Sequence, residues 1–125
     1  MAIRVLIADD SEVMRAAIAR TLKADPALEV VGEATSFAET LKQASTLNPD
    51  IVLLDLHMPD EHRYSPEIVK GPLLQSSGCI LAISVWNDGE AMALAKSIGA
   101  VALLDKADLF STLISSIKMY CTKDF

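Results

Sequence analysis

Short apolar runs alternate with stretches of helical periodicity along this chain. Runs of Val, Ile, Leu and Ala with few polar residues are typical of parallel strands that are covered by helices on both faces. The predicted strands are 3–8, 28–34, 51–55, 80–84 and 100–104. This alternation predicts an α/β fold with one parallel sheet.

Most of the segments between and after these strands carry apolar residues at helical spacing. Ser11 is the predicted N-cap of a helix over 12–23, and Ser36 with Glu39 has the pattern of a capping box. The last helix has its predicted apolar stripe at Phe110, Leu113, Ile114, Ile117 and Cys121. Helices therefore connect the strands, as a parallel sheet requires.

The connection between the third and fourth predicted strands is less regular, because it contains three prolines. Pro72 would clash with the carbonyl of Ile68 and donates no hydrogen bond, so a helix through it costs about 3 kcal/mol. We expect a long loop there, followed by a short or broken third helix. The next helix should begin after the capping pair Asn87-Asp88 and end at Gly99.

Right-handed crossovers leave few arrangements for five parallel strands. We expect a doubly wound, flavodoxin-like sheet in the order 2-1-3-4-5, with helices on both faces. Its topological switch point lies between the first and third strands, where ligands bind beyond the carboxyl ends.

Polar side chains follow four of the predicted strands. Asp9-Asp10 end the first strand, Asp55 the third and Ser84 the fourth, while Lys106 follows the fifth. Each has an ordinary interpretation alone, since the aspartates could cap a helix or a turn and the others are common surface residues. Their joint position at one rim favours a phosphoryl-accepting site with a divalent metal.

The chemistry of these residue types agrees with such a site. Neighbouring carboxylates repel one another unless a cation neutralises them. Mg²⁺ prefers oxygen ligands and binds between one or two carboxylates and a phosphate. Phosphoryl transfer mainly needs positioning and neutralisation of the phosphoryl oxygens, which Mg²⁺ and a lysine can supply.

Charge and composition exclude other classes of function. The net charge is −6 and the pI about 4.7, without a basic cluster, so we expect no direct nucleic-acid binding. No apolar run reaches the roughly 18 residues of a membrane span. We expect a cytoplasmic protein in which Cys79 and Cys121 are reduced and mostly buried.

Four motifs in order carry a resemblance to a known family. They are IADD at 7–10, LLDLHMP at 53–59, Ser84 after LAI, and GAVALLDK at 99–106. Together they resemble the CheY-like receiver domain of bacterial two-component response regulators. The resemblance extends over the whole chain and implies a single receiver domain over 1–125.

The resemblance implies a role for each motif residue in phosphoryl transfer. Asp55 would accept a phosphoryl group from a phosphohistidine of a sensor histidine kinase or a histidine phosphotransfer protein. Ser84 would donate a hydrogen bond to one phosphoryl oxygen, and Lys106 would pair with another.

The same resemblance implies a Mg²⁺ site. Asp10 would bind the ion directly and Asp9 through water. A carboxylate oxygen of Asp55 and the backbone carbonyl of His57 would complete the protein ligands. The side chains of the loop histidines are not expected to bind a transition metal.

Several positions depart from the usual pattern of the family. Val85 replaces a small residue, and with Trp86 and His57 it is expected to screen the phosphoryl group and slow its hydrolysis. Leu103 replaces an aromatic residue that moves on activation in many receivers, and Ala107 replaces a proline with a cis bond. The glycine usual in the loop after the third strand is absent, and residues 60–64 take its place. The role of the segment 60–72 stays open between a partner surface and a local irregularity.

The sequence predicts a switch rather than an enzyme. Phosphorylation would rearrange the face formed by the fourth helix, fifth strand and fifth helix, which would bind an output domain, a second copy of the chain or another protein. Two alternatives remain at this point. One is a receiver-like binding module that has lost phospho-switching, and the other is a small phosphatase or phosphotransferase, for which 125 residues leave little room.

Overall fold

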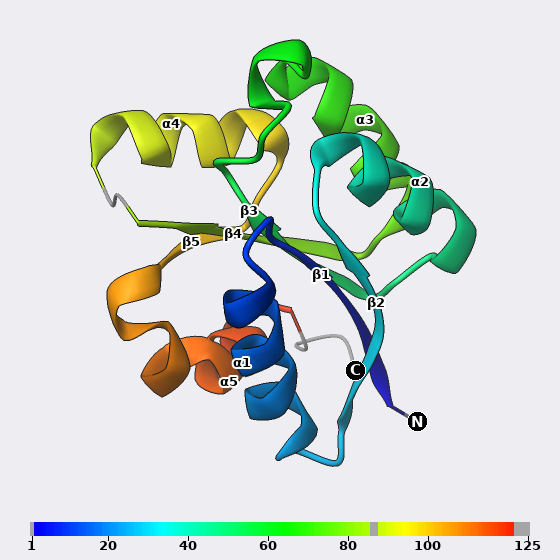
Figure 1. The fold of residues 1–125 in the computed structure, drawn as a ribbon, viewed down its shortest axis with the longest axis vertical. Helices are drawn as coiled ribbons and strands as arrows, with labels where there is room; N and C mark the ends of the chain where they lie inside the picture. Colours follow the sequence, from blue (N-terminus) through cyan, green and yellow to red (C-terminus); the bar gives the residue numbers. More distant parts are fainter. Residues whose placement is uncertain (1, 86–87, 122–125) are drawn as a thin grey trace.

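The structure is a computed structural model that describes residues 2–85 and 88–121. Its sheet has five parallel strands in the order β2-β1-β3-β4-β5, which confirms the predicted topology (Figure 1). The strands are β1 (Ile3–Ala8), β2 (Leu28–Ala34), β3 (Ile51–Asp55), β4 (Cys79–Ser84) and β5 (Ala102–Asp105). Only the last is clearly shifted from its expected range.

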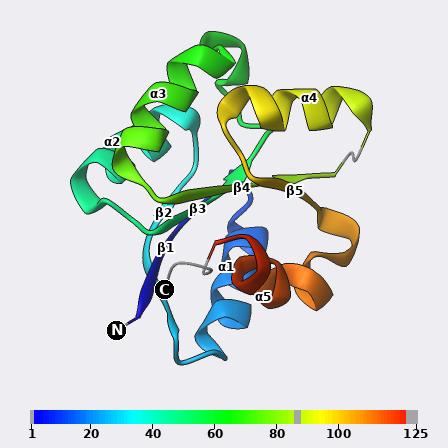
Figure 2. The same ribbon diagram turned by 180° about the vertical axis from the view of Figure 1, so that it is seen from behind.

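Helices cover both faces of this sheet. One face carries α1 and α5, and the other carries α2, α3 and α4 (Figures 1 and 2). The helices are α1 (Glu12–Lys23), α2 (Phe37–Leu47), α3 (Pro66–Ser76), α4 (Gly89–Ile98) and α5 (Leu109–Tyr120). Within the described ranges, no helix combines the length and the apolar composition needed to cross a bilayer.

The central strands are buried from end to end. Every residue of β3 and β4 is buried, because each side of the sheet has its own apolar core. Full burial of one Leu or Ile side chain contributes about 1.5–3 kcal/mol, so these strands dominate the packing free energy. The nearly uniform apolar runs of the sequence reflect this two-sided cover.

The predicted helix ends are confirmed where the structure describes them. Ser11, Ser36 and Asp88 each accept a hydrogen bond from the backbone N–H three residues later, at 3.2, 3.1 and 2.9 Å. Gly99 ends α4 with a left-handed φ of 95°, which a residue without a Cβ adopts at little cost. Asn87 lies outside the described residues.

The expected break at Pro72 is not observed. After a turn of 3-10 helix at Glu61–Arg63, α3 runs without interruption through Pro72. Pro72 and Ile68 lie on the exposed side of α3, whereas Val69 and Leu73 are buried. The lost hydrogen bond therefore falls on the solvent side, where water can satisfy the carbonyl of Ile68 and the ring has room.

The start of α5 also differs from the prediction. Phe110 is 45% exposed, and Leu109 takes the core position beside Leu113 and Ile117. The difference arises because a 3-10 turn at Lys106–Asp108 precedes the helix and sets its rotation. The helical stripe of the sequence was thus correct in its later turns only.

The expectation of reduced thiols is wrong in this structure. Cys79 at the start of β4 and Cys121 at the end of α5 form a disulfide across 42 residues of sequence. Their Cα atoms are 5.7 Å apart, which lies inside the range that a disulfide can bridge. Residue spacing along the chain carries no sign of this proximity, because it arises from the packing of α5 against the sheet.

Candidate functional site

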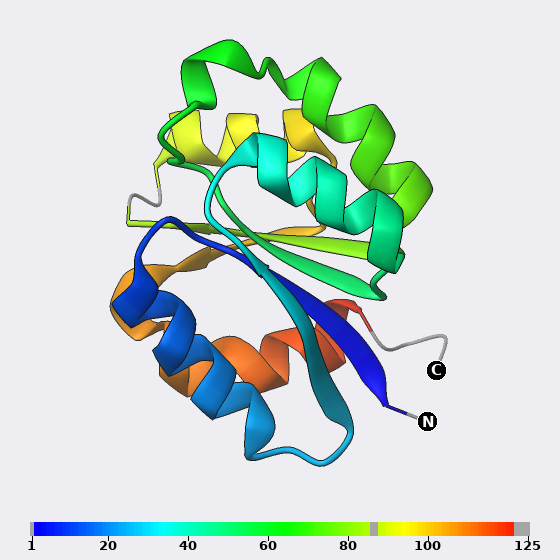
Figure 3. The same ribbon diagram turned by 45° about the vertical axis from the view of Figure 1, so that its right-hand side comes forward.

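Three carboxylates meet at the carboxyl ends of β1 and β3, as the sequence predicts. One oxygen atom from each of Asp9, Asp10 and Asp55 lies within 4.8 Å of the others. The side chains of Asp9 and Asp55 are buried, and Asp10 is exposed. The parallel pairing of β1 with β3 causes this meeting, because the β1–α1 turn and the loop after β3 leave the sheet at the same edge (Figure 3).

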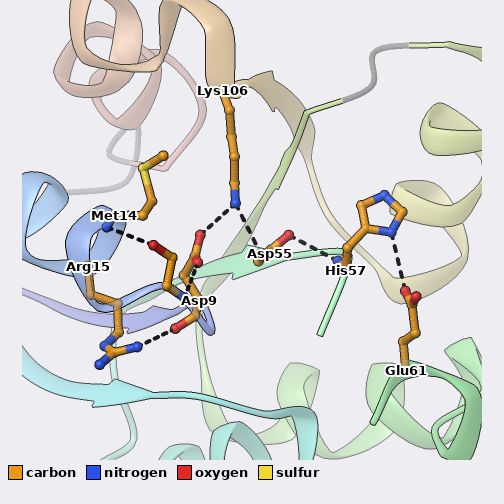
Figure 4. Close-up of polar contacts among 8 residues, drawn as sticks. Asp9, Met14, Arg15, Asp55, His57, Glu61 and Lys106 are labelled. Carbon is orange, nitrogen blue, oxygen red and sulfur yellow. Dashed lines mark hydrogen bonds and ion pairs between the residues drawn. The ribbon is translucent and has the colours of Figure 1, made fainter. Parts of the chain in front are cut away.

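Lys106 connects the acids of two strands. Its Nζ lies 2.8 Å from Oδ2 of Asp9 and 3.2 Å from Oδ2 of Asp55 (Figure 4). The lysine side chain is only 14% exposed, so water screens these contacts weakly. The structure therefore sets one ammonium against three carboxylates, which leaves an excess of negative charge when all are ionised.

Burial and charge shift the pKa of two of these groups. Burial raises the pKa of the Asp55 carboxyl, and repulsion from Asp9 adds to that rise; the N–H of His57 and the ammonium of Lys106 oppose it. Burial lowers the pKa of Lys106, but the contacts with Asp9 and Asp55 outweigh it and the net pKa lies above the ordinary value. The lysine therefore stays charged, and the site favours a cation beside Asp55.

Asp9 also organises the turn that follows β1. Its Oδ1 accepts a hydrogen bond of 2.8 Å from the backbone N–H of Ser11, the N-cap of α1. Ser11 rather than Asp9 is the N-cap of α1, and Asp9 supports that cap with one oxygen while its other oxygen faces Lys106. Its role as a metal ligand stays a prediction. The turn fixes where the Asp9 carboxylate points.

His57 contributes its backbone to the site. Its N–H donates to Oδ1 of Asp55 at 3.0 Å, while its ring Nδ1 lies 3.3 Å from Oε2 of Glu61 (Figure 4). The Asp55 carboxylate is thereby held by His57 on one oxygen and by Lys106 on the other. The carbonyl of His57 as a metal ligand stays a prediction.

Ser84 lies where the sequence places it, at the end of β4. It follows Ile83, the register partner of Asp55, and its side chain is buried. The strand order thus brings Ser84 to the same edge of the sheet as the acids. Its hydrogen bond to a phosphoryl oxygen stays a prediction.

The loop after β3 has a structural role that the sequence did not reveal. Both carboxylate oxygens of Asp60 accept hydrogen bonds from the first turn of α2, at 2.9 Å from the N–H of Phe37 and 3.1 Å from that of Ala38. The rings of Tyr64 and Phe37 lie 6.2 Å apart. Because a carboxylate at a helix N-terminus is stabilising, this loop acts at least as a cap for α2.

The unusual neighbours of the site are only partly described. Val85 is exposed, and Leu103 is half-buried against the core under α2, α3 and α4. None of the described peptide bonds is cis, so Ala107 follows a trans bond. Trp86 lies outside the described residues, and the screening of Asp55 stays a prediction.

Arg15 lies beside the site, although no pattern in the sequence singles it out. Its Nη1 donates to the backbone carbonyl of Asp9 at 2.8 Å, and its Nε lies 3.1 Å from Oε1 of Glu33. Its place in the first turn after the two aspartates is the only signal in the sequence. Asp9 and Glu33, the two partners of Arg15, become neighbours only because β1 pairs with β2.

The residues of the site fit a hard divalent cation. The ligands on offer are carboxylate oxygens, two of them from buried side chains whose repulsion a cation would relieve. Sulfur and imidazole ligands, which soft metals prefer, are not part of this cluster of described residues. Asp9, Asp10 and Asp55 are therefore the residues that could hold Mg²⁺.

Comparison with solved structures shows the same fold. The chain aligns over 98% of its length and 98% of the signal receiver domain of NarL from Mycobacterium tuberculosis, with a TM-score of 0.84 and 23% identity. The response regulator domain of Thermotoga maritima CheB aligns over 100% of both chains, with a TM-score of 0.83 and 24% identity. At this level of sequence identity, these likenesses show the fold and nothing more.

Comparison of sequences identifies the family. A protein-glutamate methylesterase/protein-glutamine glutaminase of Anaeromyxobacter dehalogenans is 39% identical over 104 residues, which cover 83% of this chain and 30% of that protein. The profile of the response regulator receiver domain matches residues 5–118. The chain belongs to the receiver domain family of response regulators, the phosphoacceptor modules of two-component signalling.

Proposed function

We propose that Asp55 is the phosphoacceptor of this receiver and that residues 1–125 act as one receiver domain. The observation that carries the proposal is the position of the Asp55 carboxylate at the end of β3. It is held there by the N–H of His57 and by Lys106, within reach of Asp9 and Asp10. An oxygen atom of Asp55 would attack phosphorus as the P–N bond of a phosphohistidine breaks, and the imidazole leaves with a proton.

The other residues of the site would assist this transfer. Mg²⁺, held by Asp9, Asp10 and Asp55, would neutralise charge on the phosphoryl group. Lys106 already touches Asp55, so it needs little movement to pair with a phosphoryl oxygen on that residue. Ser84 at the end of β4 would donate to another oxygen.

A sensor histidine kinase or a histidine phosphotransfer protein would supply the phosphoryl group. We further propose that the output surface lies on α4, β5 and α5. Large apolar side chains are exposed on or beside these elements: Met92 on α4, Val101 just before β5 and Phe110 on α5. The activities named for the relatives are not transferred, because the chain spans about a third or less of the length of the first relatives it matches.

Phosphorylation by acetyl phosphate and Mg²⁺, followed by intact-mass spectrometry, tests the proposal. The wild type should gain one phosphoryl group, and Asp55→Asn should gain none. Asp50→Asn is the matched control, because Asp50 precedes the same strand at the other edge of the sheet, where it accepts from the N–H of Arg4. Equal labelling of Asp55→Asn would contradict the assignment, and no labelling of the wild type by acetyl phosphate or a kinase would favour a binding module without a switch.

A further inference from the structure

The nearly buried side chain of Arg15 contacts two partners, Asp9 and Glu33. The side chain is 14% exposed, and two of its nitrogens have separate acceptors, the carbonyl of Asp9 and the carboxylate of Glu33 (Figure 4 shows the first). A planar guanidinium can satisfy two acceptors at fixed angles, which an ammonium cannot. The two contacts therefore fix the orientation of the guanidinium as well as the position of its charge.

The carbonyl that Arg15 holds belongs to the peptide that joins Asp9 to Asp10. Because a peptide unit is planar, an anchored carbonyl also fixes the direction in which the chain enters Asp10. The remaining polar atoms of Asp9 are held as well: its N–H donates to the carbonyl of Ala34 at 3.0 Å, Oδ1 accepts from Ser11, and Oδ2 meets Lys106. Arg15 thus completes the positioning of both acids.

Glu33 gives the guanidinium of Arg15 an acceptor on a strand that does not carry the acids. The ion pair joins the first turn of α1 to the penultimate residue of β2, and β2 lies on the other side of β1 from β3. Without Glu33, the guanidinium would be free to turn toward the exposed carboxylate of Asp10 and to compete with a metal for it. The pair therefore keeps a cation close to the site but out of the metal position.

We propose that Arg15 and Glu33 form a positioning pair that holds the Asp9–Asp10 peptide in the geometry for metal binding. The pair does not touch the metal itself. This inference rests on the proposed Mg²⁺ site. Groups that orient metal ligands typically change metal affinity by about 10–100-fold when they are removed.

The test is a Mg²⁺ titration followed by NMR at the backbone amides of Ser11 and His57. These amides donate to carboxylate oxygens of Asp9 and Asp55, so their shifts report directly on the metal site. We expect Arg15→Gln to weaken Mg²⁺ binding about tenfold. Glu33→Ala should weaken it less, and Arg15→Lys should recover part of the loss.

Arg4→Gln is the matched control for a general structural effect. Arg4 also donates to backbone carbonyls, those of Leu47 at 2.7 Å and Asn48 at 3.0 Å, but at the opposite end of β1. It should lower the melting temperature and leave Mg²⁺ affinity unchanged. At saturating Mg²⁺, Arg15→Gln should regain the wild-type rate of phosphorylation, because only the positioning of the metal ligands is impaired.

Two outcomes would overturn the inference. One is an Arg15→Gln protein that binds Mg²⁺ as tightly as Arg4→Gln does; the other is an Arg15→Gln phosphorylation rate that stays low at saturating Mg²⁺. If Arg15→Gln does not fold, the test rests on Glu33→Ala. An unchanged Mg²⁺ affinity in that variant then overturns the inference. Asp10→Asn tests the site itself: if it binds Mg²⁺ like the wild type, the proposed metal site fails, whatever Arg15 does.

Discussion

Polar groups at the amino ends of the strands are paired differently from those at the carboxyl ends. At the amino end of β1, Arg4 and Asp50 exchange backbone and side-chain hydrogen bonds, and the guanidinium of Arg4 holds two further carbonyls. The disulfide between Cys79 and Cys121 crosses the same end of the molecule. At the carboxyl end, three carboxylates cluster, and two of them, those of Asp9 and Asp55, share the ammonium of Lys106.

This contrast separates stability from function within one sheet. Groups at the amino end are matched and cross-linked, so they hold the strands together without need of a ligand. The carboxyl end keeps uncompensated negative charge, which costs stability and attracts a cation or a phosphoryl group with its metal. Changes at the first end should alter folding alone, whereas changes at the second should alter folding and ligand binding together.

The largest expected effect on stability is at the amino end. Replacing Cys79 by Ser removes a cross-link over 42 residues, which costs about 4 kcal/mol of unfolding free energy in the chain-entropy account. Urea denaturation measures this loss, and the reduced wild type should have the same unfolding free energy as Cys79→Ser. Both proteins should still bind Mg²⁺. A wild-type stability that does not respond to reductant would contradict the prediction.

The next effect is at the carboxyl end. Lys106→Met leaves the carboxylates of Asp9 and Asp55 without their cation and should lower the unfolding free energy by about 3 kcal/mol. Added Mg²⁺ should restore part of that loss, because the ion replaces the missing charge. Thermal melts with and without Mg²⁺ measure this, and a loss that Mg²⁺ does not reduce would remove the link between charge and stability at this end.

The smallest effect concerns the charge of Asp55 itself. Its pKa is raised in the folded state, by burial first and by Asp9 second, so the stability that the protonated form contributes at low pH is lost as pH rises through the folded pKa. Without Mg²⁺, Asp55→Asn should therefore melt above the wild type at neutral pH. The difference should shrink as pH falls below the usual carboxyl range, and Asp50→Asn should show no such gain.

The sequence predicted the architecture well because hydrophobic periodicity is a local property. The strand order and most caps followed from apolar runs, Ser, Asp and Gly at their ends, and the handedness of crossovers. The break expected in the third helix is absent, because the cost of Pro72 depends on whether its side of the helix faces solvent. Phe110 is exposed rather than in the core, because the short turn before α5 decides the rotation of the helix.

The sequence also predicted which acids meet, but not what holds them. Asp9, Asp10 and Asp55 were predictable because parallel strands place their carboxyl ends at one edge. The contacts from Arg15 to Asp9 and from Asp60 to α2 depend on side-chain direction across elements that are distant in sequence. The spacing of residues along the chain does not predict such contacts.

By itself, the sequence determined that this chain is a receiver with acids at the switch point of its sheet, because strand, cap and motif signals lie within a few residues of one another. Only the tertiary structure decided that Cys79 meets Cys121, that Lys106 stands between two buried carboxylates, and that Arg15 anchors the peptide leading into Asp10. The physical reason is the range of the interactions. Periodicity is set by neighbours along the chain, whereas ion pairs and cross-links are set by packing between elements.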